Sequence, residues 1–106
     1  MANTFFPVVS TFVKASTGYN LPSQDYHPKN TDYKVSIGYE TTDGKDDCLV
    51  EKVQIRYDGK IAGRRSASFP VKSQDWNNVK EAMEIVRDFY AKQTNKSLRN
   101  CIIWYE

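Results

Sequence analysis

An uninterrupted amphipathic stretch from Gln74 to about Thr94 constrains the fold of this chain most. It contains no Gly or Pro, and its apolar side chains recur at steps of three and four residues, which is the period of one helical face. Ser73 can cap its first turn, and the charge of Asp75 interacts favourably with the helix dipole there. The stretch therefore predicts one long helix.

The apolar stripe of this expected helix spans more than half of its circumference, which is more than the face of one small sheet covers. With 106 residues, of which 40% are apolar, the chain builds only a small core, and a second subunit would relieve that shortage. We therefore expect a homodimer whose interface uses Val79, Met83, Val86 and Tyr90.

Three segments before the helix are expected to be strands: Tyr33–Tyr39, Cys48–Tyr57 and Arg64–Val71. Apolar and polar side chains alternate in the first and third segments and in the second half of Cys48–Tyr57, which is the pattern of strands with one buried face. The turn dipeptides Asp43-Gly44 and Asp58-Gly59 separate them and supply the positive φ that a hairpin needs. The pattern predicts an antiparallel sheet with one apolar face and one basic, hydroxyl-bearing face.

The two ends of the chain add further expected strands. Phe5–Lys14 is rich in branched and aromatic residues, and Pro7 indicates an edge strand or a strand start. Residues 15–32 have the composition of a long loop. The run Leu98–Glu106 predicts a final strand that is either buried or paired with another chain.

These parts form a single domain, 1–106, of the α+β class. It divides into an N-terminal strand and long loop (1–32), a sheet and helix (33–94) and a tail (95–106). No apolar run approaches the roughly 18 residues of a membrane span, and the first residues lack the pattern of a secretory signal. We therefore expect an intracellular, cytoplasmic protein without a membrane partner.

Residues for metal binding or catalysis are scarce. Cys48 and Cys101 lie 53 positions apart, which fits neither a zinc site nor a disulfide framework. His27 is the single histidine, and it stands in the long loop without a nearby nucleophile. Gly59 and Gly63 do not form a phosphate-binding loop. We expect no enzyme, no cofactor and no metal.

The net charge of +2 hides an uneven distribution. From Glu40 to Glu51 five acids face Lys45 alone, whereas residues 52–72 carry six cations against Asp58. A basic sheet face can bind the phosphates of a single strand, while exposed rings stack on its bases. The alternative is an ordinary solvated face. The expected nucleic-acid-binding residues are Lys34, Tyr39, Lys45, Lys52, Arg56, Tyr57, Lys60, Arg64 and Arg65. By alternation Tyr39 and Tyr57 point to the apolar face, so packing in the core is the alternative for both.

A family resemblance lies in residues 55–83, which read IRYDGKIAGRRSASFPVKSQDWNNVKEAM. The order Ile-Arg, a turn, Gly-Arg-Arg and then Asp-Trp-Asn-Asn-Val-Lys-Glu at the helix start resembles the positive-cofactor-four type of transcriptional coactivator and its phage relatives. Ser66 stands where that family has a second glycine, and Asp75 stands where it has Gln.

The resemblance implies a curved antiparallel sheet of about four strands followed by one long helix, in a dimer whose sheets bind single-stranded DNA. Arg56, Arg64 and Arg65 fall on the family's strand-binding cations, and Tyr39 lies near an aromatic residue that stacks on bases. Trp76 falls on the tryptophan that opens the family's helix, which we expect in the core.

We therefore expect single-stranded DNA binding with little sequence preference, in replication, recombination, repair or transcription. The small size suits a phage protein. The alternative is a small non-enzymatic module that binds a partner protein through its helix or an edge strand.

Overall fold

The structure, a computed structural model, describes residues 4–17, 27–41, 47–92 and 101–103. Five strands and one helix follow one another along these residues: β1 (Thr4–Lys14), β2 (Thr31–Thr41), β3 (Cys48–Tyr57), β4 (Lys60–Ile61), α1 (Asp75–Lys92) and β5 (Cys101–Ile102). The strands form one sheet in the order β4-β3-β2-β1-β5. The pairs from β4 to β1 are antiparallel, and β5 lies parallel to β1, so the α+β class is confirmed with a mixed sheet.

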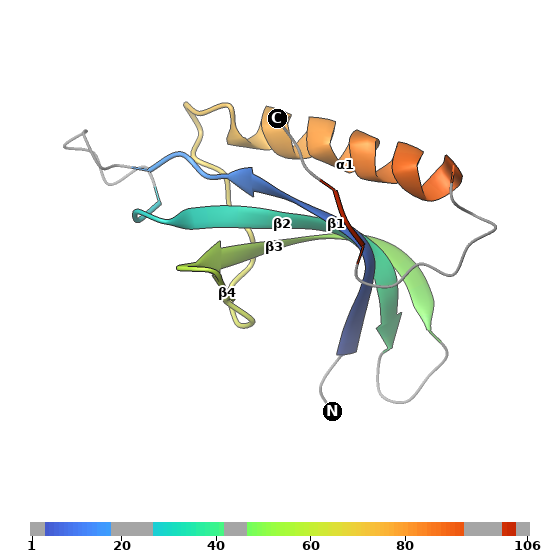
Figure 1. Cartoon of the computed structure of the whole chain (residues 1–106). Helices are drawn as coiled ribbons and strands as arrows, with labels where there is room; N and C mark the ends of the chain where they lie inside the picture. Colours follow the sequence, from blue (N-terminus) through green and yellow to red (C-terminus); the bar gives the residue numbers. More distant parts are fainter. Residues whose placement is uncertain (1–3, 18–26, 42–46, 93–100, 104–106) are drawn as a thin grey trace.

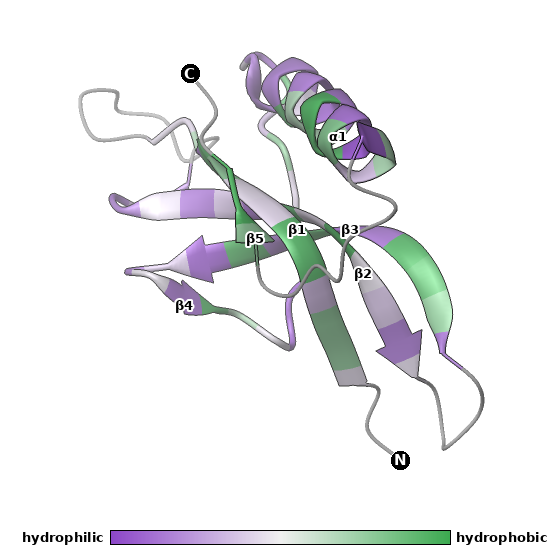
Figure 2. Ribbon diagram, turned by 45° about the vertical axis from the view of Figure 1, so that its right-hand side comes forward, coloured by the Kyte–Doolittle hydropathy of each residue, from purple (hydrophilic) through white to green (hydrophobic). Residues whose placement is uncertain are grey.

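The helix lies on one face of the sheet, over β1 and β2 (Figure 1). Its buried residues Val79, Ala82 and Val86 belong to the same core cluster as the buried valines, Ile37, Ile55 and Tyr33 of the strands. Burying a side chain of this size contributes about 1.5–3 kcal/mol. Figure 2 shows the apolar side of α1 turned toward the sheet. The periodicity therefore predicted the helix correctly, and the residues that it buries on the sheet belong to the predicted stripe.

The predicted strand Arg64–Val71 is wrong. The hairpin turns at Asp58 and Gly59, where φ is 52° and 80°, and β4 then ends after two residues. No strand forms in residues 62–74, yet Ala67 and Phe69 pack against the core. The alternation in this segment therefore reflects side chains that cover the sheet, without a ladder of backbone hydrogen bonds.

The tail joins the sheet of its own chain. Cys101 and Ile102 pair with Val9 and Ser10 of β1, and the Ile103 N–H donates to the Ser10 carbonyl oxygen at 2.8 Å. The other residues of the predicted strand Leu98–Glu106 lie outside the described residues. β5 thus pairs within the chain, at the outer edge of β1.

A buried carboxylate ties the start of the helix to two other segments. Asp75 is 2% exposed and accepts hydrogen bonds from the Ser16 N–H at 2.9 Å, from the Ser16 hydroxyl at 2.7 Å and from the Tyr33 hydroxyl at 2.6 Å. The N–H of Asp75 donates in turn to the Ser73 hydroxyl at 3.2 Å, so the predicted cap is present. Asp75 connects α1, β2 and the segment after β1.

The same contact predicts instability in alkali. Burial, the hydrogen bond to Asp75 and the charge of Asp75 all raise the pKa of Tyr33 above its ordinary value of 10.0. The unfolded chain ionises Tyr33 near pH 10 and the folded chain does not, so the stability that this residue contributes is present below pH 10 and lost above it. We expect the free energy of unfolding to fall as the pH rises past about 10, and Tyr33→Phe to reduce that fall. An equal slope in both proteins, measured by urea unfolding, would contradict this account.

Candidate nucleic-acid interface

One face of the sheet has no described helix or strand packed on it. We call it the open face, and its side chains follow from the register of the strands because directly opposed residues point to the same side. Three successive rows carry, in order, Asp32 with Arg56, then Phe12, Lys34 and Gln54, then Ser10, Ser36 and Lys52. Neighbouring rows on one face are about 6.7 Å apart. Arg56, Lys34 and Lys52 therefore place a cation in each row, and Lys14 adds a second one beside Asp32 in the first row.

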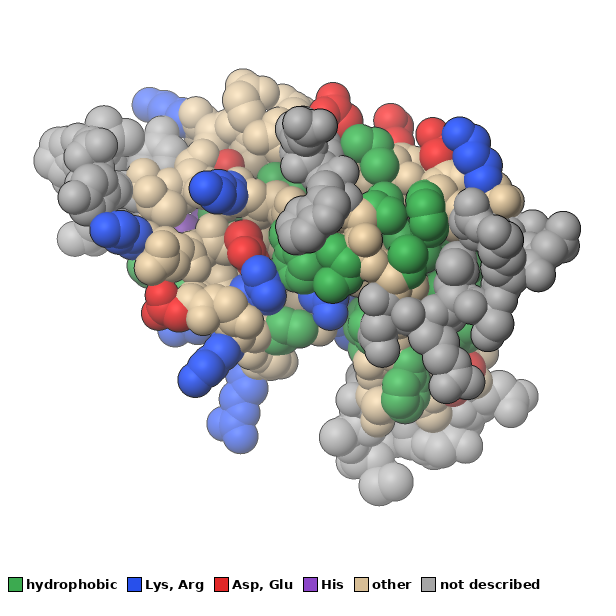
Figure 3. Space-filling view, in the orientation of Figure 1, with side chains coloured by type: hydrophobic (Ala, Val, Ile, Leu, Met, Phe, Trp, Pro, Cys, Tyr) green, Lys and Arg blue, Asp and Glu red, His purple; other side chains and the backbone are tan. Residues whose placement is uncertain are grey.

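The open face is concave. The first half of β1, the last half of β2 and the first half of β3 bend together away from the helix (Figure 1). The space-filling view shows a hollow below the sheet, with Lys and Arg side chains along one rim (Figure 3). The hydroxyls of Ser10 and Ser36 hydrogen-bond to each other at 2.7 Å and are almost fully buried. They are the polar residues of the third row, beside Lys52.

Arg56 is held rigidly on this face. Its guanidinium donates to both carboxylate oxygens of Asp32 at 2.6 Å and lies 4.1 Å from the centre of the Phe12 ring. The hydrogen bond to Asp32 raises the pKa of Arg56 further, against the opposing effect of burial. One plane of the guanidinium therefore stacks on Phe12, in a geometry known from arginines that also stack on nucleobases.

Lys52 and Lys34 differ in whether a neighbouring acid pairs with them. Lys52 forms an ion pair with Glu40, and its ammonium lies 5.0 Å from the centre of the Phe5 ring. Lys34 makes no ion pair with any described residue. Burial, and secondly the positive charge of Arg56, lower the pKa of Lys34. A bound anion would therefore stabilise the charged form of Lys34.

The remaining predicted binding residues lie elsewhere. Tyr57 and Lys60 share the helix side of the sheet, and the guanidinium of Arg65 lies 5.7 Å from the centre of the Tyr57 ring. Arg64 is exposed in the segment after β4. Tyr39 also points to the helix side, where hydrogen bonding to its hydroxyl raises the pKa of Tyr90. Lys45 lies outside the described residues.

The four residues predicted for a dimer interface also contact the core of their own chain. Val79 and Val86 are 2% and 0% exposed because they pack on the sheet of their own chain. Met83 and Tyr90 are partly buried against the same core. Trp76, expected in the core, lies in the first turn of the helix and is 51% exposed. Its ring centre is 5.1 Å from that of Phe69, and the Lys80 ammonium lies 5.9 Å from it. The helix buries more of its stripe within one chain than the sequence suggested.

Sequence reasoning missed Phe5, Phe12, Asp32 and Glu40, which the structure adds to the open face. The alternation in Phe5–Lys14 indicates two faces, but only the register shows that Phe12 lies beside Lys34. Nothing in the local sequence marks Asp32 and Glu40 as part of this face, because the cations that they pair with lie on another strand. Among described residues, no three His, Cys, Asp or Glu side chains gather into a metal site.

Comparisons with known proteins add no name to this geometry. A scan against protein-family models, a search of curated proteins and a search of solved structures each find no match. Across the part of the chain that the structure describes, no helix has the length and apolar character needed to span a membrane.

Proposed function

We propose that this protein binds single-stranded DNA along the open face with little sequence preference. The observation that supports this most is the order of Arg56, Lys34 and Lys52 in three successive rows of the concave open face. An extended single strand presents phosphates at a spacing comparable with that of the rows, so each cation can meet a separate phosphate.

The two acids of the open face moderate the expected affinity. Lys14, Lys34, Lys52 and Arg56 carry four positive charges, against Asp32 and Glu40. The excess is small, but the acids also fix Arg56 and Lys52 in position, so that less side-chain freedom is lost on binding. We expect weak to moderate binding with a measurable salt dependence.

Phe12 and Phe5 complete the proposed site. Each ring already carries a cation over it, so we expect bases to stack on the outer plane of Arg56 and on exposed ring edges. Hydrogen bonds to base edges are not required for this mode, which is why sequence preference should be slight. The homodimer, and a role in replication, recombination, repair or transcription, stay predictions.

The experiment that tests the proposal is titration of a fluorescent twenty-base oligonucleotide at several salt concentrations. Neutralising three phosphates of a single strand gives a slope of log affinity against log salt of about −2. Lys34→Gln should weaken binding about tenfold at low salt and reduce the slope by about 0.7, because one ion contact is lost.

The control is Lys92→Gln, which removes the same charge from the last turn of α1, away from the open face. It should leave both the affinity and the slope nearly unchanged. Equal losses in the two variants would mean that binding depends on overall charge, and the open face would no longer be the site. Tighter binding of duplex than of single strands would also contradict the proposal.

A further inference from the structure

The outer edge of β3 is paired along only a short part of its length. β4 pairs with Arg56 and Tyr57, and the Ala62 N–H donates to the Ile55 carbonyl oxygen at 2.9 Å. In an antiparallel strand, the N–H and C=O of every second residue point to the same edge. The backbone groups of Val53 and Glu51 therefore point outward like those of Ile55, and no described strand pairs with them.

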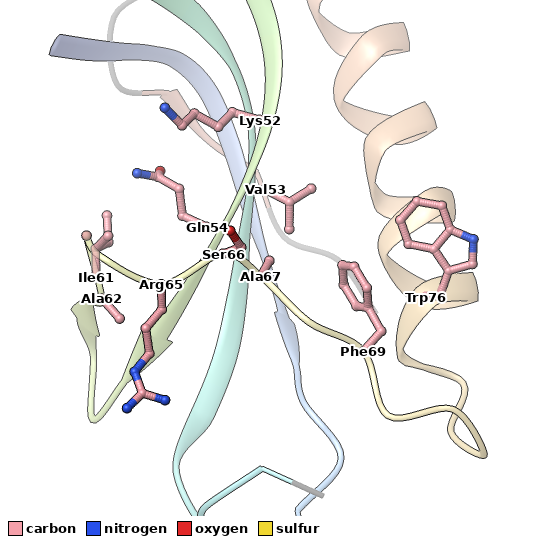
Figure 4. A pocket seen from close by; sticks show the side chains of 11 residues that line it. Lys52, Val53, Gln54, Ile61, Ala62, Arg65, Ser66, Ala67, Phe69 and Trp76 are labelled. Carbon is pink, nitrogen blue, oxygen red and sulfur yellow. The ribbon is translucent and has the colours of Figure 1, made fainter. Parts of the chain in front are cut away.

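A cleft of about 410 Å³ opens at this edge (Figure 4). The segment after β4 leaves β3, crosses toward the helix and forms the second wall. Figure 4 shows Lys52 and Gln54 on one side of β3, and Val53 and Phe69 on the other, with Trp76 beyond Phe69 on the helix. The lining residues are Lys52, Val53, Gln54, Ile61, Ala62, Gly63, Arg65, Ser66, Ala67, Phe69 and Trp76.

The chemistry of the cleft differs on the two sides of the strand. On the side of the open face the strand offers Lys52 and Gln54. On the helix side the cleft offers Val53, Phe69 and the half-exposed ring of Trp76, and Arg65 lies near Tyr57 at one end of that side. No Asp or Glu is among the residues that line it. An exposed tryptophan beside a cleft is typical of a residue that anchors a partner.

We propose that this edge binds an extended peptide with alternating acidic and apolar side chains, which adds to β3 as a further strand. The outward N–H and C=O groups would pair with the peptide backbone. Successive side chains of a strand point to opposite faces. Acidic side chains would therefore meet Lys52 on the side of the open face, while apolar ones would pack on Val53, Phe69 and Trp76.

The free backbone groups favour a peptide over a nucleic acid as the occupant. A nucleic-acid strand has no donor and acceptor series that matches the outward groups of Glu51 and Val53, whereas a peptide does. The proposal also goes beyond single-stranded DNA binding, because the edge and its aromatic side lie outside the open face. Lys52 and Gln54 are the residues that both surfaces share.

The test uses the full chain and a short fluorescein-labelled peptide of alternating Glu and Val. We expect saturable binding by fluorescence anisotropy, and slower hydrogen exchange at the Glu51 and Val53 amides when the peptide is bound. Trp76→Ser should weaken peptide binding at least fivefold. The control Ile85→Ser removes an exposed apolar side chain from the opposite side of α1 and should bind normally.

Several results would overturn the proposal. Equal binding of a peptide of alternating Lys and Val would show that charge does not select the partner. Equal binding of a peptide with its glutamates in one block would show that the alternation of a strand is not recognised. Protection of the Glu51 and Val53 amides by single-stranded DNA, or by raising the protein concentration alone, would assign the edge to nucleic acid or to a second copy. Unchanged exchange at both amides with the peptide bound would exclude strand addition.

The peptide and DNA proposals fail independently. Lys34→Gln should impair oligonucleotide binding and leave peptide binding intact, because Lys34 lies in the middle of the open face. Trp76→Ser should do the reverse. Loss of both activities in Trp76→Ser would show that this variant is damaged as a whole, and amide exchange in the wild-type protein would then decide the matter.

Discussion

Asp75→Ala is expected to lower the free energy of unfolding by about 2–4 kcal/mol, since it removes a buried charged acceptor and leaves its donors unpaired. The carboxylate receives hydrogen bonds from the Ser16 N–H and hydroxyl and from Tyr33, which come from sequence positions 59 and 42 residues away. Water cannot easily replace it, because Asp75 is 2% exposed. The Tyr33 hydroxyl has a second acceptor, the Ser68 carbonyl oxygen at 2.9 Å, which limits the loss.

Urea unfolding followed by circular dichroism measures this loss. Asp88→Ala is the matched control, since Asp88 is exposed on the same helix, and it should change stability by less than about 0.5 kcal/mol. Asp75→Asn should fall between the two, because the amide keeps one oxygen as an acceptor. A loss in Asp75→Ala no larger than that of the control would show that the buried carboxylate adds no net stability.

The behaviour of Asp75 shows what periodicity can and cannot predict. The spacing of apolar residues was enough to predict α1, and Ser73 was enough to place its start. The same reasoning assigned Asp75 only a favourable charge on the first turn. Its partner Ser16 lies in a segment with a loop composition, and nothing in the local sequence indicates that this segment returns to the helix.

The strands show the same limit in another form. Alternation predicted Tyr33–Tyr39 and Cys48–Tyr57 as strands because each keeps one side on the core. It failed for Arg64–Val71, where Ala67 and Phe69 face the core without a pairing strand. Alternation reports which side chains are buried, and a strand additionally needs a neighbour for its backbone groups. β3 finds such a neighbour on one edge along its whole length and on the other only near Tyr57.

For the candidate site, the sequence predicted residue types better than their arrangement. Lys34, Lys52 and Arg56 were expected on one polar face and lie there together. The ion pairs of Arg56 with Asp32 and of Lys52 with Glu40 depend on the register between β2 and β3, which a single sequence does not specify. Alternation along the strands already turned Tyr39 and Tyr57 away from this face, and the structure places both on the helix side. The predicted basic segment therefore divides between the open face and the hairpin end.

β1 and β2 approach each other closely at Gly38, which lies on the open face. The pairing of β1 with β2 is irregular between Pro7 and Val9, beside this glycine. A Cβ on Gly38 would lie 2.4 Å from the Phe6 carbonyl oxygen and 2.8 Å from the Pro7 Cα. Both are backbone atoms, so no side-chain rotation can relieve the overlap.

Gly38→Ala should therefore destabilise the fold by about 3 kcal/mol or more, because β1 must move away from β2 where both strands bend.

Gly63→Ala is the matched control. A Cβ there meets no atom within 4 Å, and the residue does not have a positive φ. That variant should be neutral or stabilise by up to about 1 kcal/mol, since alanine reduces the freedom of the unfolded chain. Thermal unfolding of the two variants separates these effects, and similar midpoints would mean that the strands can part at Gly38 without cost. A stable Gly38→Ala protein that still bound oligonucleotides normally would further show that the bend is not needed to align Arg56, Lys34 and Lys52.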